Sequence, residues 1–357
     1  MARHGRRIKR CGTCVERKVK CDEQQPHSMY FGRIHQDKQA CNQGLRLYSY
    51  ALTQLRSEIN SSSTDMGTIM GVMCLCVYEN VVFSQPTAWL LHYDGLGRLL
   101  QSRGPKPLET EAERQIWRVA RYFIILSAGH QRKRIFLEQP QWASIHCIPQ
   151  GETPEKFDLL LDMFAQFPGI IEDYDRLRKS TFIHPDTREA FRQRVQSLID
   201  RIHAWLRNIP WICTLDPTTR ENSQGQLPDD PMDCASLAVC YAILLCLIQP
   251  CDCLKINIIP DHDQYNVDPA RIDFLTLEIC RFSSWALRGG DTANLALLLI
   301  YPLQITWFFL QGTPEKLHRV RENLDLGIAD THGFELGRMR EWNELNLEQG
   351  RYGFMYK

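Results

Sequence analysis

The sequence predicts an all-α protein, in which a large helical domain over residues 35–357 follows a short basic segment over residues 1–34. Two observations predict this class. Beyond residue 35, apolar residues recur at spacings of three and four, the period of an amphipathic helix, whereas the alternation typical of strands is scarce. Proline and glycine separate these apolar stretches, as expected where one helix ends and the next begins.

The N-terminal segment combines cysteines at metal-binding spacing with a run of cations. Two residues separate Cys11 from Cys14, and Cys21 follows seven residues after Cys14. Cysteines at the first spacing can bind one zinc ion together, and a third that lies one or two helical turns away can join them. Residues 1–20 carry eight Lys and Arg side chains against a single acid, Glu16. The segment is therefore suited to bind phosphate groups.

This arrangement resembles the first half of the fungal binuclear zinc-cluster domain, in which six cysteines hold two zinc ions and a short basic helix enters the major groove. The family pattern, Cys-x2-Cys-x6-Cys-Asp and then a proline, is matched by Cys11, Cys14, Cys21, Asp22 and Pro26. The resemblance implies that Lys18 donates to the O6 and N7 atoms of guanine. The DNA-binding residues expected on this basis are Arg6, Arg7, Lys9, Arg10, Arg17, Lys18 and Lys20.

The second half of the family pattern is missing. Ser28 stands where the resemblance expects the fourth cysteine, and positions 31 and 38 carry no cysteine either. The binuclear cluster therefore cannot form as it does in relatives, and we expect at most one zinc ion. Its expected ligands are Cys11, Cys14 and Cys21, with a fourth ligand from among His27, His35 and Cys41.

An alternative interpretation is that residues 1–34 form a disordered basic tail that holds no zinc. Eight cations and one acid give residues 1–20 a net charge of +7, so such a tail would bind nucleic acid through counterion release. Without a fixed helix, however, the tail would not read bases. A gene sequence that lacks the exon for the remaining cysteines would give the same pattern.

Charge and cysteine content place the protein inside the cell. The formal net charge of the chain is zero, so residues 21–357 carry about −7, which indicates a basic arm on an acidic body. No apolar signal sequence follows the cationic start, and we therefore expect the 14 cysteines to be reduced. The closely spaced Cys251 and Cys253 do not make a metal pair. The basic run over residues 3–10 also favours the nucleus.

Helices are expected in order along the rest of the chain. The first helix ends before Ser61 and is predicted by an apolar stripe, whose residues are given below. Thr64 or Asp65 is expected to cap the second, a buried helix from about 66 to 83. Residues 216–230 are polar and indicate a loop, which is a candidate subdomain boundary. The apolar stripe of the first helix consists of Leu45, Tyr48, Leu52, Leu55 and Ile59. Further helices are expected at 89–102, 111–128, 154–165, 169–180, 187–207, 233–248, 270–288, 292–310 and 314–329.

Residues 40–145 resemble the regulatory domain that follows many fungal zinc clusters. The markers of this second resemblance are Asp65, Leu75, Tyr78, Glu79, Trp89, His92, Gly95, Arg103, Gly104 and Pro105. The two resemblances together imply a large helical regulatory domain preceded by a small, incomplete zinc-cluster segment. Relatives of this kind read CGG triplets in double-stranded DNA as monomers or dimers, and some bind a small-molecule inducer.

Several side chains have a structural and a functional interpretation. Among apolar neighbours, His92 is expected to be a hydrogen-bonded core residue and not a metal ligand or base, and Glu79 and Arg103 are expected to form a buried ion pair. The aromatic residues 307–309 are expected in the core, with a ligand pocket as the alternative. Residues 293–310 are expected to form a core helix and not a membrane span, because Pro302 and polar residues interrupt the apolar run.

The motifs of common enzymes are absent from the sequence. It contains no Gly-x-Ser-x-Gly, no glycine-rich phosphate loop and no His-Glu-x-x-His, and the acidic group at 229–233 has no partner motif. We therefore expect no enzyme, but a sequence-specific, DNA-binding transcription regulator in the nucleus, acting as a monomer, homodimer or heterodimer without a membrane partner. The alternative is a helical ligand-binding or protein-binding module that derives from such a regulator and has lost DNA binding.

Overall fold

The computed structural model describes residues 32, 35–60, 65–85, 87–143, 145, 155–209, 227–258, 268–288, 292–310 and 313–340. Every regular element within these ranges is helical, which confirms the predicted all-α class. The helices are α3 (Lys38–Asn60), α4 (Met66–Val82), α5 (Ala88–Arg103), α6 (Glu111–Gln131), α7 (Pro140–Ala143), α8 (Lys156–Phe164), α9 (Phe167–Lys179), α10 (Pro185–Arg207), α11 (Pro231–Leu254), α12 (Asp268–Ala286), α13 (Ala293–Phe309) and α14 (Pro314–Arg321). Two 3-10 turns, η1 (Phe136–Glu138) and η5 (Glu335–Gly337), and a π-helix, η4 (Glu322–Asp330), complete the set.

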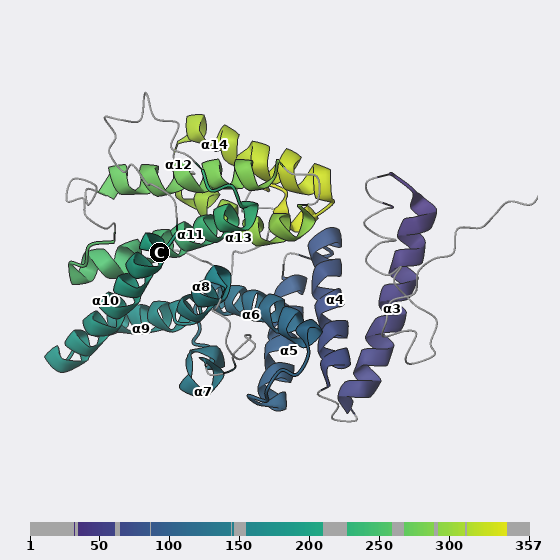
Figure 1. Cartoon of the computed structure of the whole chain (residues 1–357), viewed down its shortest axis with the longest axis horizontal. Helices are drawn as coiled ribbons and strands as arrows, with labels where there is room; N and C mark the ends of the chain where they lie inside the picture. Colours follow the sequence, from purple (N-terminus) through teal and green to yellow (C-terminus); the bar gives the residue numbers. More distant parts are fainter. Residues whose placement is uncertain are drawn as a thin grey trace, which may run out of the picture.

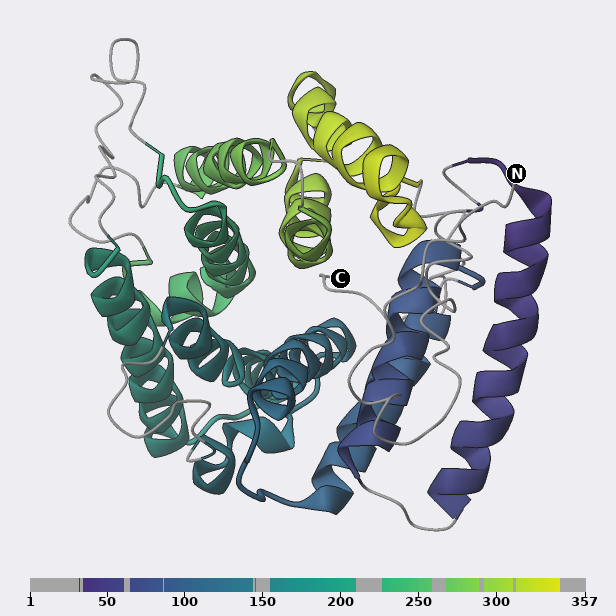
Figure 2. The same cartoon turned by 45° about the vertical axis from the view of Figure 1, so that its right-hand side comes forward.

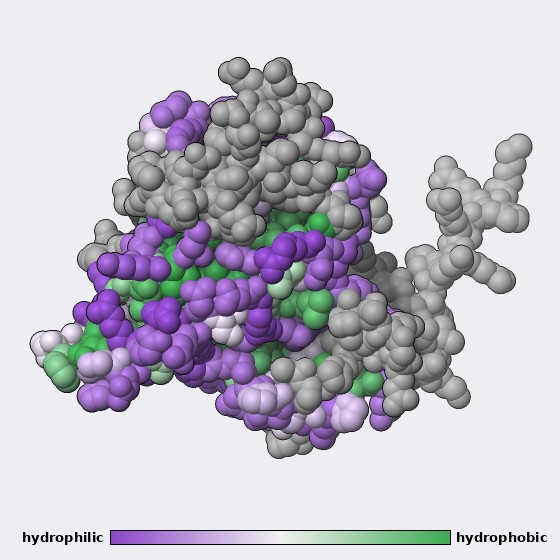
Figure 3. Space-filling model, turned by 60° about the vertical axis from the view of Figure 1, so that its left-hand side comes forward, coloured by the Kyte–Doolittle hydropathy of each residue, from purple (hydrophilic) through white to green (hydrophobic). Residues whose placement is uncertain are grey.

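The helices follow one another around the molecule, from α3 at one edge through α10 to α14 (Figure 1, Figure 2). In both views α4 separates α3 from the other helices. On the side turned away from α3, hydrophilic side chains cover much of the described surface, and a band of apolar side chains shows between them (Figure 3). The arrangement leaves α3 as the most peripheral helix of the described chain.

Helix α11 forms the centre of the core. Its residues 233–248 are all buried, and it packs against α8, α9, α10, α12 and α13. Among the described residues it is the one helix that is long and apolar enough to cross a membrane, but nearly all of its most apolar stretch is buried inside the protein. The predicted core position of α13 is also confirmed, because Leu299, Tyr301 and Leu303 are buried.

Two predicted helix boundaries are wrong. Pro250 was expected to end a helix, but it lies inside α11, which continues to Leu254. Burial of α11 against its neighbours outweighs the roughly 3 kcal/mol that a proline costs inside a helix. The single helix expected at 314–329 is instead α14 followed by η4, in which Asn323 donates to the carbonyl oxygen of Arg319 and accepts from Ser284 Oγ. Apolar spacing does not distinguish a π-helix from an α-helix.

The starts of α4 and α6 are fixed by capping side chains. Asp65, one of two predicted caps, accepts a hydrogen bond from the amide of Thr68 at 2.7 Å and begins α4. Thr110 and Glu113 form a reciprocal capping box at α6. The helices on either side of the candidate boundary at 216–230 pack together, since α8, α9 and α10 all contact α11; residues 216–226 lie outside the described residues.

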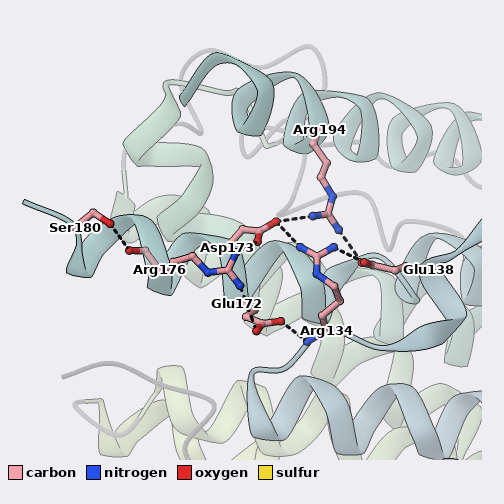
Figure 4. A network of polar contacts seen from close by, with 7 residues as sticks. All are labelled: Arg134, Glu138, Glu172, Asp173, Arg176, Ser180 and Arg194. Atoms are coloured by element: carbon pink, nitrogen blue, oxygen red, sulfur yellow. Dashed lines mark hydrogen bonds and ion pairs between the residues drawn. The ribbon is translucent and has the colours of Figure 1, made fainter. Parts of the chain in front are cut away.

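Ion pairs join helices on the surface of the body. Asp173 of α9 accepts from Arg194 of α10 at 2.6 Å and from Arg134 at 2.7 Å, and Glu138 of η1 accepts from both arginines (Figure 4). The backbone of Gly169 lies directly beneath this network, where a Cβ atom would collide with the Glu138 carboxylate and approach Arg194 Nη2 to 2.8 Å. The glycine therefore allows the segment from Arg134 to η1, α9 and α10 to share one set of charges.

Candidate functional site at the junction of α3 with the body

Most of the predicted zinc and DNA-binding residues lie outside the described residues. This applies to Cys11, Cys14, Cys21 and His27, and to Arg6, Arg7, Lys9, Arg10, Arg17, Lys18 and Lys20. Of the other two candidate ligands, His35 is exposed in the turn before α3, and Cys41 is partly buried and packs against the core. Within the described ranges, no three His, Cys, Asp or Glu side chains come together as a metal site.

Helix α3 is the first long element after the basic segment. The carboxylate of Asp37 accepts hydrogen bonds from the amides of Gln39 at 2.8 Å and Ala40 at 3.1 Å, and so fixes the start of the helix at Lys38. In sequence, α3 is therefore the long helix nearest to the predicted DNA-binding segment, and its contacts with α4 and α5 define the candidate site.

Three contacts along its length hold α3 against α4. Near its C-terminal end, Thr68 Oγ1 donates to Glu58 Oε2 at 2.8 Å. About one turn earlier in α3, Leu55 lies over Gly71 of α4. A Cβ atom added at Gly71 would be 2.8 Å from Leu55 Cδ2, so the glycine permits the close approach of the two helices. Two turns earlier still, the ring of Tyr48 of α3 stacks on the ring of Tyr78 of α4, with their centroids 4.0 Å apart. The two helices therefore run antiparallel.

A buried carboxylate anchors the third contact. The Glu79 side chain is 3% exposed, and its oxygens accept from Tyr48 Oη at 2.9 Å and from Ser84 Oγ at 2.7 Å. His92 Nε2 of α5 lies 3.0 Å from Tyr48 Oη and 3.9 Å from Glu79 Oε1. Tyr48, Glu79, Ser84 and His92 are called the Glu79 cluster below. Because hydrogen-bond donors from α3 and from the α4–α5 loop satisfy the buried charge, the cluster ties together three successive elements.

The cluster confirms one prediction and corrects another. His92 is a hydrogen-bonded, half-buried residue, as expected. The predicted Glu79–Arg103 ion pair is wrong, because Arg103 lies at the C-terminal end of α5 and its Nη1 donates to the carbonyl oxygen of Lys106. Sequence reasoning placed Tyr48 on an apolar stripe but missed its hydroxyl as the partner of Glu79. A tyrosine within a stripe of leucines was the available signal, since a buried tyrosine hydroxyl usually finds a partner.

Burial sets the protonation of the Glu79 cluster. Burial and the negative charge of Glu79 raise the pKa of Tyr48, and burial lowers the pKa of His92 against the opposing pull of Glu79. At neutral pH the tyrosine hydroxyl therefore keeps its proton and donates it to the carboxylate, while the imidazole is neutral. The cluster therefore joins α3, α4 and α5 by hydrogen bonds to a buried carboxylate, as a clamp does.

Replacing Tyr48 with phenylalanine is expected to loosen α3. The change keeps the ring that stacks on Tyr78 but removes the donor to buried Glu79, at a cost of about 1–3 kcal/mol in the local opening of α3. Hydrogen exchange of the α3 amides, measured by mass spectrometry, should accelerate accordingly. Tyr50→Phe is the matched control, because Tyr50 is 57% exposed on the same helix. Equal exchange in both variants would show that the hydroxyl does not hold α3.

A small cavity lies between α4, α5, α6 and α13. Its volume is about 20 Å³, and its walls include Asn80, Trp89, Tyr93, Tyr301 and Gln304. This space suits one water molecule, whereas sites for drug-sized ligands measure about 300–1,000 Å³. Residues 307–309 are half-buried and do not line it, and Trp307 and Phe309 pack against the core.

Comparison with known proteins gives one family and one relative. A family model described as a fungal specific transcription factor domain matches residues 28–260, which is more than half of the chain and includes the Glu79 cluster. The uncharacterized protein AN5342 of Emericella nidulans is 31% identical over 121 residues, which are 33% of this chain and 26% of the relative. The chain thus matches about a quarter of the length of that relative. No solved structure matches.

Proposed function

The chain belongs to the family of proteins with a fungal specific transcription factor domain, and we propose that it is a DNA-binding transcription regulator that acts in the nucleus. One observation carries the proposal: a basic segment with zinc-binding cysteine spacing directly precedes the domain that the family model matches. The positive charge is concentrated where the cysteines are, so that one short segment combines phosphate attraction with a means of fixing its own shape.

In the proposed mechanism, Cys11, Cys14 and Cys21, with a fourth ligand from among His27, His35 and Cys41, would hold one zinc ion, which would cross-link the segment. Lys18 then donates to guanine in CGG-type sites of double-stranded DNA, while Arg17 and Lys20 contact phosphates. The four cations at positions 6, 7, 9 and 10 add affinity that depends on salt but not on sequence. The protein acts by binding and carries out no reaction.

The structure supports a role for α3 in this mechanism. α3 begins at Lys38 and is held on the body by the Glu79 cluster, so only 17 residues separate Lys20 from a helix that is fixed in place. A short attachment restricts the positions that the basic segment can occupy relative to the body. Binding events on the body can therefore bias how the segment meets DNA.

A second candidate function is that of a module which has lost DNA binding and acts by pairing with, or sequestering, another regulator. The observation that favours it is the absence of the second half of the cysteine pattern, with Ser28 in place of the fourth cysteine. The two functions differ in zinc content and in preference for CGG-bearing DNA. A homodimer or heterodimer and a small-molecule inducer are compatible with both.

Replacing Lys18 with alanine tests the first function. Affinity for a CGG-bearing duplex should fall by about 1–3 kcal/mol, whereas affinity for a scrambled duplex should change little, because one base contact is lost. Fluorescence anisotropy at several salt concentrations measures both, and zinc is quantified in the same preparation. Lys106→Ala, at an exposed position of the body, is the control. Equal affinity of the unaltered protein for both duplexes, without bound zinc, would contradict the first function and favour the second.

A further inference from the structure

One flank of α3, beside the face that packs on α4, carries exposed aliphatic side chains. Leu45 is 49% exposed, Leu52 is 38% exposed and Ile59 is 49% exposed, and the three residues are seven positions apart. Residues at this spacing share one face of a helix. On the neighbouring face, Tyr48 and Leu55 pack against α4.

Cations without counterions accompany these apolar residues. Lys38 and Arg56 fall on the same face, since they lie seven positions before Leu45 and four positions after Leu52, and Arg46 lies beside them. All three cations are exposed, and none forms an ion pair within the described residues. The one acid of α3, Glu58, accepts from Thr68 on the side of α4. Lys38, Leu45, Leu52, Arg56 and Ile59 are called the outer face of α3 below.

Elsewhere in the body, buried or half-buried arginines are neutralised. Arg118 and Arg121 share Asp158, and Arg132 makes a bidentate pair with Asp175. The outer face differs from these buried pairs, because its cations are exposed and stand beside exposed aliphatic side chains. Clustered exposed apolar residues rimmed by charge mark interaction surfaces.

We propose that the outer face of α3 is a docking site for an amphipathic helix of a partner protein, in which aspartate or glutamate flanks an apolar stripe. Leu45, Leu52 and Ile59 span about 21 Å along α3, the length of about four helical turns. A partner helix of that length places an apolar residue against each of them and acids against Lys38, Arg46 and Arg56. DNA offers phosphates to the cations but no apolar surface to the three aliphatic side chains.

The clamp of α3 favours such docking. The Glu79 cluster and the Tyr48–Tyr78 stack already hold α3 against α4. A partner therefore binds a folded helix, and no conformational entropy is lost in ordering α3. The inference does not depend on zinc or on DNA binding. It goes beyond the proposed function, because it concerns a protein partner and a surface of the body.

The experiment uses the full chain and a designed probe. The probe is a fluorescein-labelled helical peptide of about 21 residues with leucine at spacings of three and four and glutamate beside them, and a matched peptide carries lysine in place of glutamate. Fluorescence anisotropy should show binding of the acidic peptide and at least about tenfold weaker binding of the basic one. Added salt should weaken the binding of the acidic peptide.

Two variants and a matched control locate the site. Leu52→Asp should weaken binding of the acidic peptide by at least about tenfold, and Arg56→Glu should shift the preference towards the basic peptide. Leu159→Asp is the control, because Leu159 is 41% exposed on α8, and it should bind the peptide as the unaltered protein does. Arg56→Glu replaces an exposed side chain and is expected to keep the unfolding temperature, which is also measured for Leu52→Asp because Leu52 is only 38% exposed.

Three results would overturn the proposal. The first is equal affinity for the acidic and basic peptides, or an equal effect of Leu52→Asp and Leu159→Asp. The second is a dimer in light scattering that Leu52→Asp separates, which would show that a second copy covers the outer face. The third is a protein that does not bind the acidic peptide and loses affinity for a scrambled DNA duplex in Arg56→Glu, which would make the face a DNA contact.

Discussion

Replacing Asp158 with alanine is expected to lower the free energy of unfolding by about 3–5 kcal/mol, because the change leaves charge buried without its partner. The Asp158 side chain is 7% exposed and accepts from Arg118 Nε at 3.0 Å, Arg118 Nη2 at 2.6 Å and Arg121 Nη2 at 2.9 Å. Arg121 is itself 7% exposed. Urea denaturation followed by circular dichroism measures the change.

Asp162→Ala is the matched control for this prediction. Asp162 also binds Arg121, at 2.6 Å, but its side chain is 34% exposed, and burial raises the pKa of its carboxyl group against the opposing effect of Arg121. Its loss leaves Arg121 paired with Asp158 and should cost about 1 kcal/mol or less. Equal losses in the two variants would show that Asp158 has no special place between α6 and α8.

Acidification is expected to lower the free energy of unfolding by about 3 kcal/mol through His130 alone. Burial beside Trp89, whose ring centroid is 5.2 Å from that of His130, lowers the pKa of this histidine from 6.5 to about 4. Above about pH 7 the imidazole is neutral in both states. Between about pH 6.5 and pH 4 the unfolded chain binds the proton and the folded chain does not, so stability falls with pH. Below about pH 4 the loss is complete.

The His130→Leu variant isolates this contribution. Unfolding is followed at a series of pH values from 7.5 to 4, and the difference between the unaltered protein and the variant should shrink by about 3 kcal/mol towards the acid end. The comparison with the variant is needed because burial also lowers the pKa of His92. Parallel curves for the two proteins would show that His130 is not the group that resists protonation.

Apolar periodicity was sufficient to predict the helical class and most helix positions. The expected helix at 66–83 is α4, and the expected helix at 292–310 is α13. Periodicity failed where packing decided the outcome. It places Pro250 at a break because a proline disfavours a helix, but burial of α11 on several sides supplies more energy than the proline removes.

The candidate site was less predictable than the fold. The sequence gives Leu45, Tyr48, Leu52, Leu55 and Ile59 as a single stripe, because alternating spacings of three and four join two adjacent helix faces. The structure divides this stripe into Tyr48 and Leu55, which pack against the body, and three aliphatic residues that stay 38–49% exposed. Spacing shows which residues share a side of a helix, but only the positions of neighbouring helices decide how wide a side is covered.

The central position of α11 has a consequence for synthesis of the protein. During translation this helix leaves the ribosome before α12 and α13, the two elements with which it makes most of its contacts. Translation proceeds at about 5–20 residues per second, so the apolar surface of α11 stays unpacked for several seconds before α12 and α13 are made. During this time the nascent chain is a substrate for chaperones that bind apolar segments. The yield of native protein then depends on how fast these chaperones release the chain.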